Sequence, residues 1–210
     1  MFSPIHSLLT VYGEKNMLLL ASLLFIVGRS PHGWLRRLGA VDNAGCGVVH
    51  LVGGWSSLVA TMYLGPRTGI TGNPETVVMG NPTFCCAGLF ITWWGYLAMN
   101  SASTLGVEGT RWLQSAKGTV LTMITSFGGG SMGLFLNYMF FGGHTIHVGK
   151  MVTTVMGSLV SYGAITFLCT PTETIIIGMI AALIVFFGLL FLDANHNIDD
   201  PCCTFLGDVS

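Results

Sequence analysis

Asp42 and His50 are two ionisable side chains within one apolar, glycine-rich segment, residues 41–54, which reads Val-Asp-Asn-Ala-Gly-Cys-Gly-Val-Val-His-Leu-Val-Gly-Gly. A neutral imidazole accepts a proton on one ring nitrogen and donates one from the other, which is the chemistry of a proton relay. Ionisable groups inside a membrane are costly, so they commonly face a partner or a conduction path. A histidine satisfied within a protein core is the alternative interpretation, and the segment alone leaves both open.

The carboxylate of Asp42 has a structural role available to it. A helix is predicted to begin just after Asp42, so the side chain can accept the free N–H groups of the first turn and oppose the positive end of the helix dipole. Asp200 precedes a proline, which favours a first helical turn, so Asp200 is predicted to cap a second helix. Asp208 follows Asp200 at the same spacing as His50 follows Asp42. The repeated spacing indicates two related halves, and capping explains both aspartates better than direct substrate contact.

The composition of the chain indicates whether it folds in water or in a lipid bilayer. Only 8% of the 210 residues are charged, 51% are hydrophobic and the mean hydropathy is strongly positive, which is typical of an integral membrane protein. The formal net charge is −1 and the basic residues are scattered, so nucleic acid is not expected as a partner. The six cysteines match neither zinc nor redox spacing and are predicted to be buried thiols. His144 and His147 have no carboxylate or cysteine nearby, so neither a metal nor a cofactor is expected.

Six apolar stretches separated by polar residues predict an all-α membrane protein, a polytopic helical bundle. A spanning helix needs about 20 residues, which five of the stretches provide and the first does not. We therefore expect residues 1–210 to form a single integral membrane domain that is incomplete. The predicted spans are about 17–28, 44–64, 83–104, 119–141, 151–169 and 174–192. Three of them contain clusters of glycine and serine, which predict close approach of helix backbones.

Three passages together resemble the ammonium transporter (Amt) family. They are residues 42–54 followed by Leu-Gly-Pro-Arg at 64–67, Asn-Ser-Ala-Ser-Thr-Leu-Gly at 100–106, and Ile-Asp-Asp-Pro at 198–201. Similar patterns occur in that family in this order and at about this spacing. The resemblance extends from about residue 33 to residue 201, and the combination of order and spacing makes it far more specific than any single passage.

The resemblance implies part of an eleven-helix, channel-like transporter, ten of whose helices form two inverted halves. The six spans resemble its fourth to ninth helices, the middle portion of an animal or plant-type member. Such a protein conducts ammonium or ammonia, and often methylammonium, through a hydrophobic pore. The implied partners are the lipid bilayer and two further copies in a homotrimer, and the expected location is the plasma membrane.

Site residues are implied one by one. His50 matches the first of two histidines that face each other in the family's pore and share a proton. Ser103 matches a hydroxyl at the outer site that recruits ammonium, although a hydroxyl that only packs between helices explains it equally well. Met99 aligns with one of two stacked phenylalanines that gate the pore, and it could still exclude water.

Two features depart from the family pattern. Asp208 stands where the second pore histidine is expected, and an ionised carboxylate can only accept hydrogen bonds, so it cannot replace an imidazole. The tryptophan expected upstream of Pro31 is absent. Nearby aromatic residues on the third predicted span are interpreted as packing or lipid-facing side chains rather than a relocated gate; they are Trp93, Trp94 and Tyr96.

Two functions follow from these observations. The first is transport of ammonium, ammonia or methylammonium through a pore that contains His50. The second is a truncated or degenerate, non-transporting membrane subunit that associates with full-length relatives. An enzyme is not expected, because the sequence offers no nucleophile with a base and no set of metal ligands outside the spans.

Overall fold

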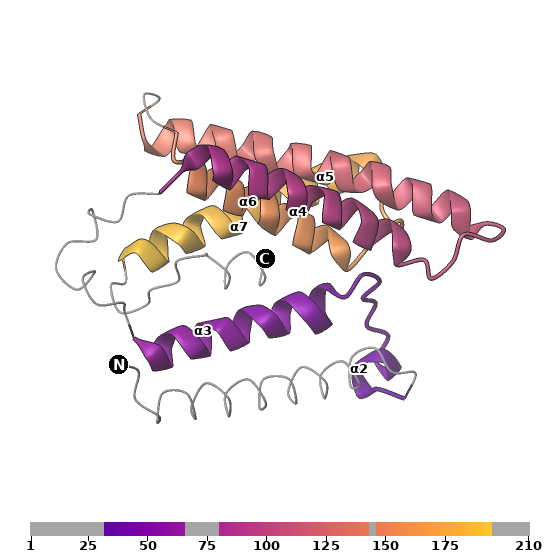
Figure 1. Ribbon diagram of the computed structural model, residues 1–210. Coiled ribbons are helices and arrows are strands. Elements are labelled where there is room, and N and C mark those ends of the chain that lie inside the picture. Colours follow the sequence, from indigo (N-terminus) through magenta and orange to yellow (C-terminus); the bar gives the residue numbers. More distant parts are fainter. Residues whose placement is uncertain (1–31, 66–79, 143–145, 195–210) are drawn as a thin grey trace.

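The computed structural model describes residues 32–65, 80–142 and 146–194, and the regular structure of these ranges is helical with no strand. The helices are α2 (Trp34–Arg37), the π-helix η1 (Cys46–Leu51), α3 (Val52–Leu64), α4 (Pro82–Ala102), α5 (Arg111–Phe140), α6 (Val148–Gly163) and α7 (Pro171–Ala194) (Figure 1). The prediction of an all-α membrane protein is confirmed. Residues 17–28, His144, Asp200 and Asp208 lie outside the described ranges.

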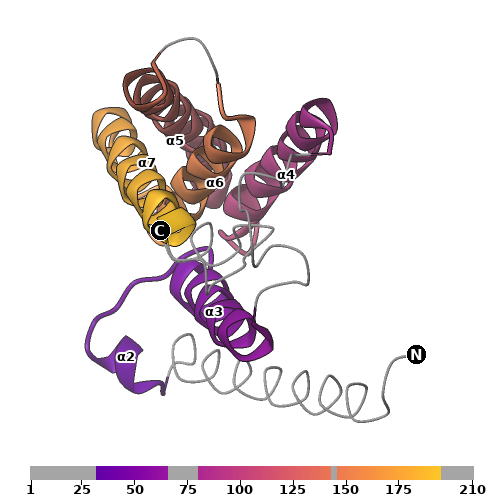
Figure 2. The same cartoon turned by 90° about the vertical axis from the view of Figure 1, so that its left-hand side faces the viewer.

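Helices α5, α6 and α7 form the core, since each packs against the other two. Helix α4 packs on α5 and α6, as the end-on view shows (Figure 2). Glycine allows this close approach: a Cβ atom at Gly133 of α5 would lie 2.3 Å from Thr154 Oγ1 of α6. A Cβ atom at Gly178 of α7 would lie 2.5 Å from the carbonyl oxygen of Thr125 of α5. The small residues of α5 thus lie where close backbone packing is expected from the sequence.

Local hydrogen bonds, rather than the ends of the apolar stretches, set the helix ends. Helix α4 begins at Pro82, where Asn81 Oδ1 accepts the N–H groups of Thr83 and Phe84 at 2.9 and 3.2 Å. Helix α5 begins before the predicted span 119–141, because polar residues interrupt the apolar pattern of its first two turns, which read Arg-Trp-Leu-Gln-Ser-Ala-Lys. Helix α6 ends at Gly163, short of the predicted end at residue 169, and the Phe167 N–H then donates to the Tyr162 hydroxyl at 3.0 Å in the turn that follows.

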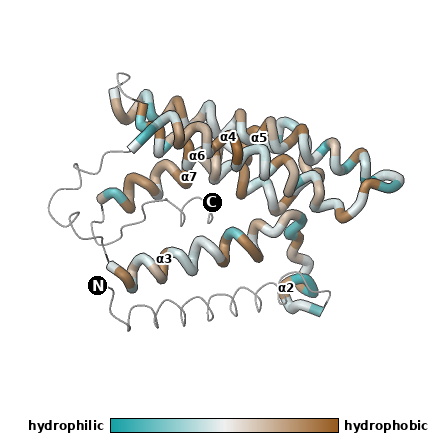
Figure 3. The backbone as a smooth tube through the Cα atoms, viewed as in Figure 1, coloured by the Kyte–Doolittle hydropathy of each residue, from teal (hydrophilic) through white to brown (hydrophobic). Residues whose placement is uncertain are grey.

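Three of the described helical segments are long and apolar enough to cross a membrane: Cys46–Leu64, which joins η1 and α3, then α5 and α7. Hydrophobic residues occur along the helices of the bundle (Figure 3), and some of their side chains lie on the outside of the bundle. Phe90, Ile91 and Ile184 are more than half exposed there. A surface this rich in large apolar side chains suits lipid better than water.

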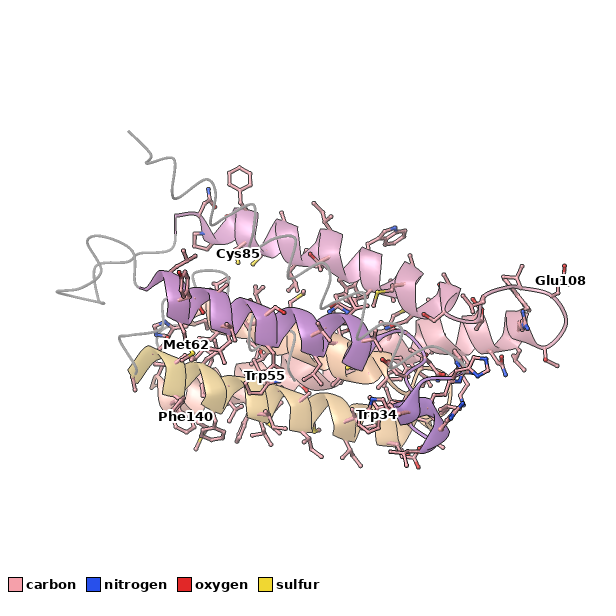
Figure 4. The ribbon with its side chains drawn as sticks, turned by 90° about the horizontal axis from the view of Figure 1, so that it is seen from below. Trp34, Trp55, Met62, Cys85, Glu108 and Phe140 are labelled. Carbon is pink, nitrogen blue, oxygen red and sulfur yellow. The ribbon has the colours of Figure 1, made fainter. Side chains whose placement is uncertain are left out.

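Helix α3 lies beside the bundle rather than within it (Figures 1 and 2). Among the described helices it contacts only η1, which in turn contacts α6. Val59 and Met62 on α3 are 64% and 60% exposed, and Met62 is labelled in Figure 4. The helix that follows His50 therefore leaves most of its surface uncovered by the described part of the chain.

Candidate functional site

The turn before η1 is organised by Asp42. One carboxylate oxygen accepts the Gly45 N–H at 2.9 Å, and the other accepts those of Gly47 and Val48 at 3.0 and 3.1 Å. Gly45 has a φ of +91°, a left-handed conformation that glycine adopts without steric cost. The negative side chain thus binds three N–H groups at the positive end of the helix, which is the capping geometry expected for Asp42.

The same turn is docked on the end of α6. The N–H groups of Asn43 and Ala44 donate to the carbonyl oxygens of Ala164 and Gly163 at 3.0 and 2.9 Å. The Asn43 side-chain amide also donates to the carbonyl oxygen of Thr166 at 3.1 Å. These bonds fix the start of η1 against the core although α3 lies outside it.

His50 lies in η1, whose π-helical turns are wider than those of an α-helix. Short π-helical segments occur frequently at functional sites, because the extra residue changes the direction in which side chains project. The imidazole is half-buried, and its Nε2 atom lies 3.4 Å from the hydroxyl oxygen of Tyr96 on α4. The two rings are stacked, with centroids 5.6 Å apart and planes inclined by 29°. A side chain of η1 is therefore paired with one of α4.

Tyr96 is held in place by the core. It is 7% exposed and packs in a cluster with Val155, Leu159 and Val160 of α6. Met99 of α4 is packed against the same cluster. The aromatic ring therefore lies in a well-packed apolar setting, with its hydroxyl directed at the imidazole. The interpretation of Tyr96 as a packing aromatic is right for its ring, but it omitted the contact of its hydroxyl with His50.

The other two aromatic residues differ from Tyr96. Trp93 packs against the same cluster and donates its indole N–H to Ser126 Oγ of α5 at 3.0 Å. Trp94 is 73% exposed on the outside of α4. Their surroundings agree with packing and lipid-facing roles, respectively.

Met99 and Ser103 follow Tyr96 on one face of α4, because residues three or four positions apart lie on the same side of a helix. Ser103 is the last residue of this series, and its hydroxyl donates to the carbonyl oxygen of Met99 at 2.7 Å. The spacing of Tyr96, Met99 and Ser103 was visible in the sequence and could have pointed to Tyr96. Its significance depended on knowing that His50 faces the same side of α4.

Asn100 lies beside this face and is fully buried. Its side-chain amide donates to Thr122 Oγ1 of α5 at 3.1 Å, whereas its Oδ1 atom has no hydrogen-bond partner in the described part of the chain. A Cβ atom at Gly163 would lie 3.8 Å from that oxygen and also from Ala44 Cβ. Asn100 therefore lies where α4, α6 and the Asp42 turn meet.

The arrangement offers proton acceptance and hydrogen bonding in an apolar environment. The imidazole of His50 can hold or release a proton, and the phenol of Tyr96 can donate to it or accept from it. No three of the described His, Cys, Asp and Glu residues are grouped to hold a metal ion. His147 instead lies against Phe141, with ring centroids 4.1 Å apart, and its possible partner His144 is outside the described ranges.

A bundle of long apolar helices, with a few polar groups where η1, α4 and α6 meet, defines a multi-pass helical membrane protein. The sequence profile of the Ammonium Transporter Family matches residues 2–205. This chain belongs to that family.

Individual relatives agree with the assignment. A relative from Caenorhabditis elegans is 32% identical over 194 residues, which make up 89% of this chain and 28% of the relative. Ammonium transporter Amt2 from Archaeoglobus fulgidus is 33% identical over 168 residues, covering 77% of this chain and 34% of its own length. The chain thus spans about a third of these relatives.

Solved structures give the same result for the fold. A protein described as a sensor Amt protein matches with a TM-score of 0.73 and 27% identity, over 84% of this chain and 43% of its own. Mep2 from Candida albicans matches with a TM-score of 0.74 over 85% of this chain and 38% of its own. At 23% identity, the second likeness shows the fold alone.

Proposed function

We propose that this chain takes part in the transmembrane transport of ammonium or ammonia, including methylammonium, through a hydrophobic pore that contains His50. The observation that carries the proposal is the half-buried imidazole of His50, which lies against the apolar bundle and is paired with Tyr96. Membership of the ammonium transporter family supports the substrate class.

The chemistry of the substrate explains why an imidazole suits this position. A bare cation loses its hydration in an apolar constriction, and this desolvation costs several kcal/mol even after the protein relaxes. If the proton is held apart from the amine, the neutral molecule crosses the apolar part at a lower cost. His50 would hold the proton, Ser103 would bind the substrate by a hydrogen bond, and Met99 would exclude water.

Uptake of labelled methylammonium into cells that lack their own ammonium transporters tests this function. The chain should raise uptake above that of cells with an empty vector, and His50→Ala should remove most of the increase. His147→Ala is the matched control, because His147 lies in the α5–α6 loop against Phe141. This substitution is expected to leave uptake unchanged. Uptake equal to that of the empty vector would refute transport by this chain alone.

We also propose a homotrimer in the plasma membrane, as the family resemblance implies. The uncovered surface of α3 is compatible with burial against further helices, since Val59 and Met62 are largely exposed. Cross-linking of the protein in native membranes would show a trimeric species. A monomer under conditions that preserve other membrane trimers would contradict this assembly.

A second function is supported by Met99, which stands where the family resemblance implies a gating phenylalanine. In this alternative the chain is a non-transporting membrane subunit that associates with full-length relatives. Co-expression with a full-length ammonium transporter separates the two functions. The alternative requires that the two proteins co-purify and that the chain alone gives no uptake. It would be excluded if the chain did not co-purify with the full-length protein or did not change the transport of that protein.

A further inference from the structure

The contact between His50 and Tyr96 adds a residue to the proposed site, because the site residues predicted from the sequence did not include a tyrosine. The hydroxyl oxygen lies 3.4 Å from His50 Nε2, which is within hydrogen-bonding reach but longer than the ideal distance. Hydrogen bonds at functional sites are commonly long in the unliganded state and shorten when substrate binds. The stacked rings hold the two groups together independently of that bond.

The position of the hydroxyl is fixed by packing. The Tyr96 ring is 7% exposed and lies among Val155, Leu159 and Val160 of α6. A ring in such an apolar cluster has little freedom to rotate, so its hydroxyl is presented to Nε2 without further ordering. The backbone of the His50 segment is fixed in turn by the hydrogen bonds of Asp42 and Asn43 to the start of η1 and the end of α6.

A phenol suits the two protonation states of an imidazole. A neutral tyrosine donates its O–H to an unprotonated Nε2, and its oxygen accepts a hydrogen bond when Nε2 carries a proton. Neither arrangement requires the phenol to give up its proton. A carboxylate could only accept, and its negative charge would hold the imidazole in its protonated form.

We propose that Tyr96 is a positioning residue for His50: its hydroxyl donates to Nε2, keeps the neutral imidazole protonated on Nδ1, and remains its hydrogen-bond partner when the ring gains a proton. Tyr96 thereby gives His50 the neutral donor-and-acceptor partner that a second imidazole would supply. The part of Tyr96 in transport rests on the proposed function. Its effect on the tautomer of His50 can be measured whether or not the chain transports.

Nitrogen NMR of the purified chain in lipid, labelled with ¹⁵N-histidine, tests the proposal. His50→Gln identifies the His50 signals as those that disappear. We expect an unprotonated, hydrogen-bonded Nε2 and a protonated Nδ1 in the unsubstituted chain at a pH where the ring is neutral. Tyr96→Phe keeps the ring and removes the hydroxyl, so the Nε2 signal should lose the shift due to this hydrogen bond. Tyr63→Phe on α3, where Tyr63 is 73% exposed, should change nothing.

Transport gives a second readout. Loss of a single hydrogen bond to His50 should lower methylammonium uptake by about three- to tenfold in Tyr96→Phe and leave Tyr63→Phe unchanged. A protonated Nε2 in the unsubstituted chain, or an unaltered His50 spectrum in Tyr96→Phe, would overturn the proposal. If no variant transports, the proposed function fails for this chain alone, and the spectrum still decides the role of Tyr96. If Tyr96→Phe does not fold, the spectrum of the unsubstituted chain provides the test.

Discussion

Asp42 makes three hydrogen bonds to the backbone at the start of η1. Its two oxygens accept the N–H groups of Gly45, Gly47 and Val48, which would otherwise lack partners at the start of η1. In an apolar environment such unpaired groups are especially costly. The position of His50 therefore depends on a carboxylate at the other end of the same segment.

Asp42→Ala should lower the free energy of unfolding by about 2 kcal/mol, because it removes the acceptor of all three bonds. Denaturation of the purified chain with sodium dodecyl sulfate, followed by helical circular dichroism, measures this change. Glu108→Ala is the matched control, since Glu108 lies exposed at the tip of the α4–α5 turn (Figure 4). Equal effects of the two substitutions would contradict the capping role.

A substrate-binding role of the Ser103 hydroxyl can be distinguished from a packing role by comparison with Ser101. Ser103 donates to the carbonyl oxygen of Met99, and Ser101 makes a similar bond to the carbonyl oxygen of Ala98 at 3.0 Å. If Ser103 binds the substrate, Ser103→Ala should raise the methylammonium concentration for half-maximal uptake about fivefold, the loss expected for one hydrogen bond. Ser101→Ala should leave this concentration unchanged, and an equal rise in both variants would indicate a packing role only.

At the scale of the elements, the interfaces of α5 with α6 and α7 depend on glycine for different reasons. The obstacle at Gly133 is the side chain of Thr154, which can change its rotamer. The obstacle at Gly178 is the backbone carbonyl of Thr125, which can move only with its helix. Helix association in lipid relies on such close contact, because lipid supplies little hydrophobic driving force between helices.

A ranking of alanine substitutions follows from these obstacles. Gly178→Ala should destabilise the bundle most, by about 3 kcal/mol, and Gly133→Ala less, by about 1 kcal/mol. Gly88→Ala on α4 meets nothing within 4 Å and should be neutral or slightly stabilising. Detergent denaturation of the three variants measures the order, and a Gly88→Ala effect as large as that of Gly178→Ala would contradict it.

At the scale of the whole molecule, the described chain consists of a packed bundle, α4 to α7, with α3 and the short helix α2 outside it. Helices α4 to α7 protect one another, whereas α3 contacts only η1 among the described helices. Elements with few packing contacts open locally at a lower free energy than the core does. The stability of the segment that carries His50 therefore differs between its docked start and the end that the described helices leave uncovered.

Hydrogen exchange should reveal this difference. Amides of α3 are expected to exchange faster than those of α5, α6 and α7 in the monomeric purified chain, and those of η1 should be intermediate because its start is docked on α6. Mass spectrometry of peptides after exchange in detergent measures the rates. Equal protection of α3 and α7 would mean that α3 is covered by segments outside the described ranges or by another copy.

The sequence alone determined that this protein is a helical membrane protein, that Asp42 can cap a helix, and that its ordered motifs belong to a transporter family. The first two conclusions rest on composition, periodicity and local hydrogen-bonding chemistry, which depend on neighbouring residues; the third rests on the resemblance of the motifs to those of the family. The start of α5 and the end of α6 were less predictable, since polar helical turns and hydrogen-bonded turns do not follow the apolar pattern. The positions of Asp200 and Asp208 lie outside the described residues, so their roles stay predictions.

Only the tertiary structure decided which groups meet. His50 and Tyr96 are 46 residues apart in the chain, and they face each other because α4 packs on α6 while the Asp42 turn is docked on the end of the same helix. No local pattern specifies such a contact, because it depends on how three separate segments pack. The chemistry of a single residue could therefore be predicted from its type and its neighbours in the sequence. The partner of the His50 imidazole was decided by the fold.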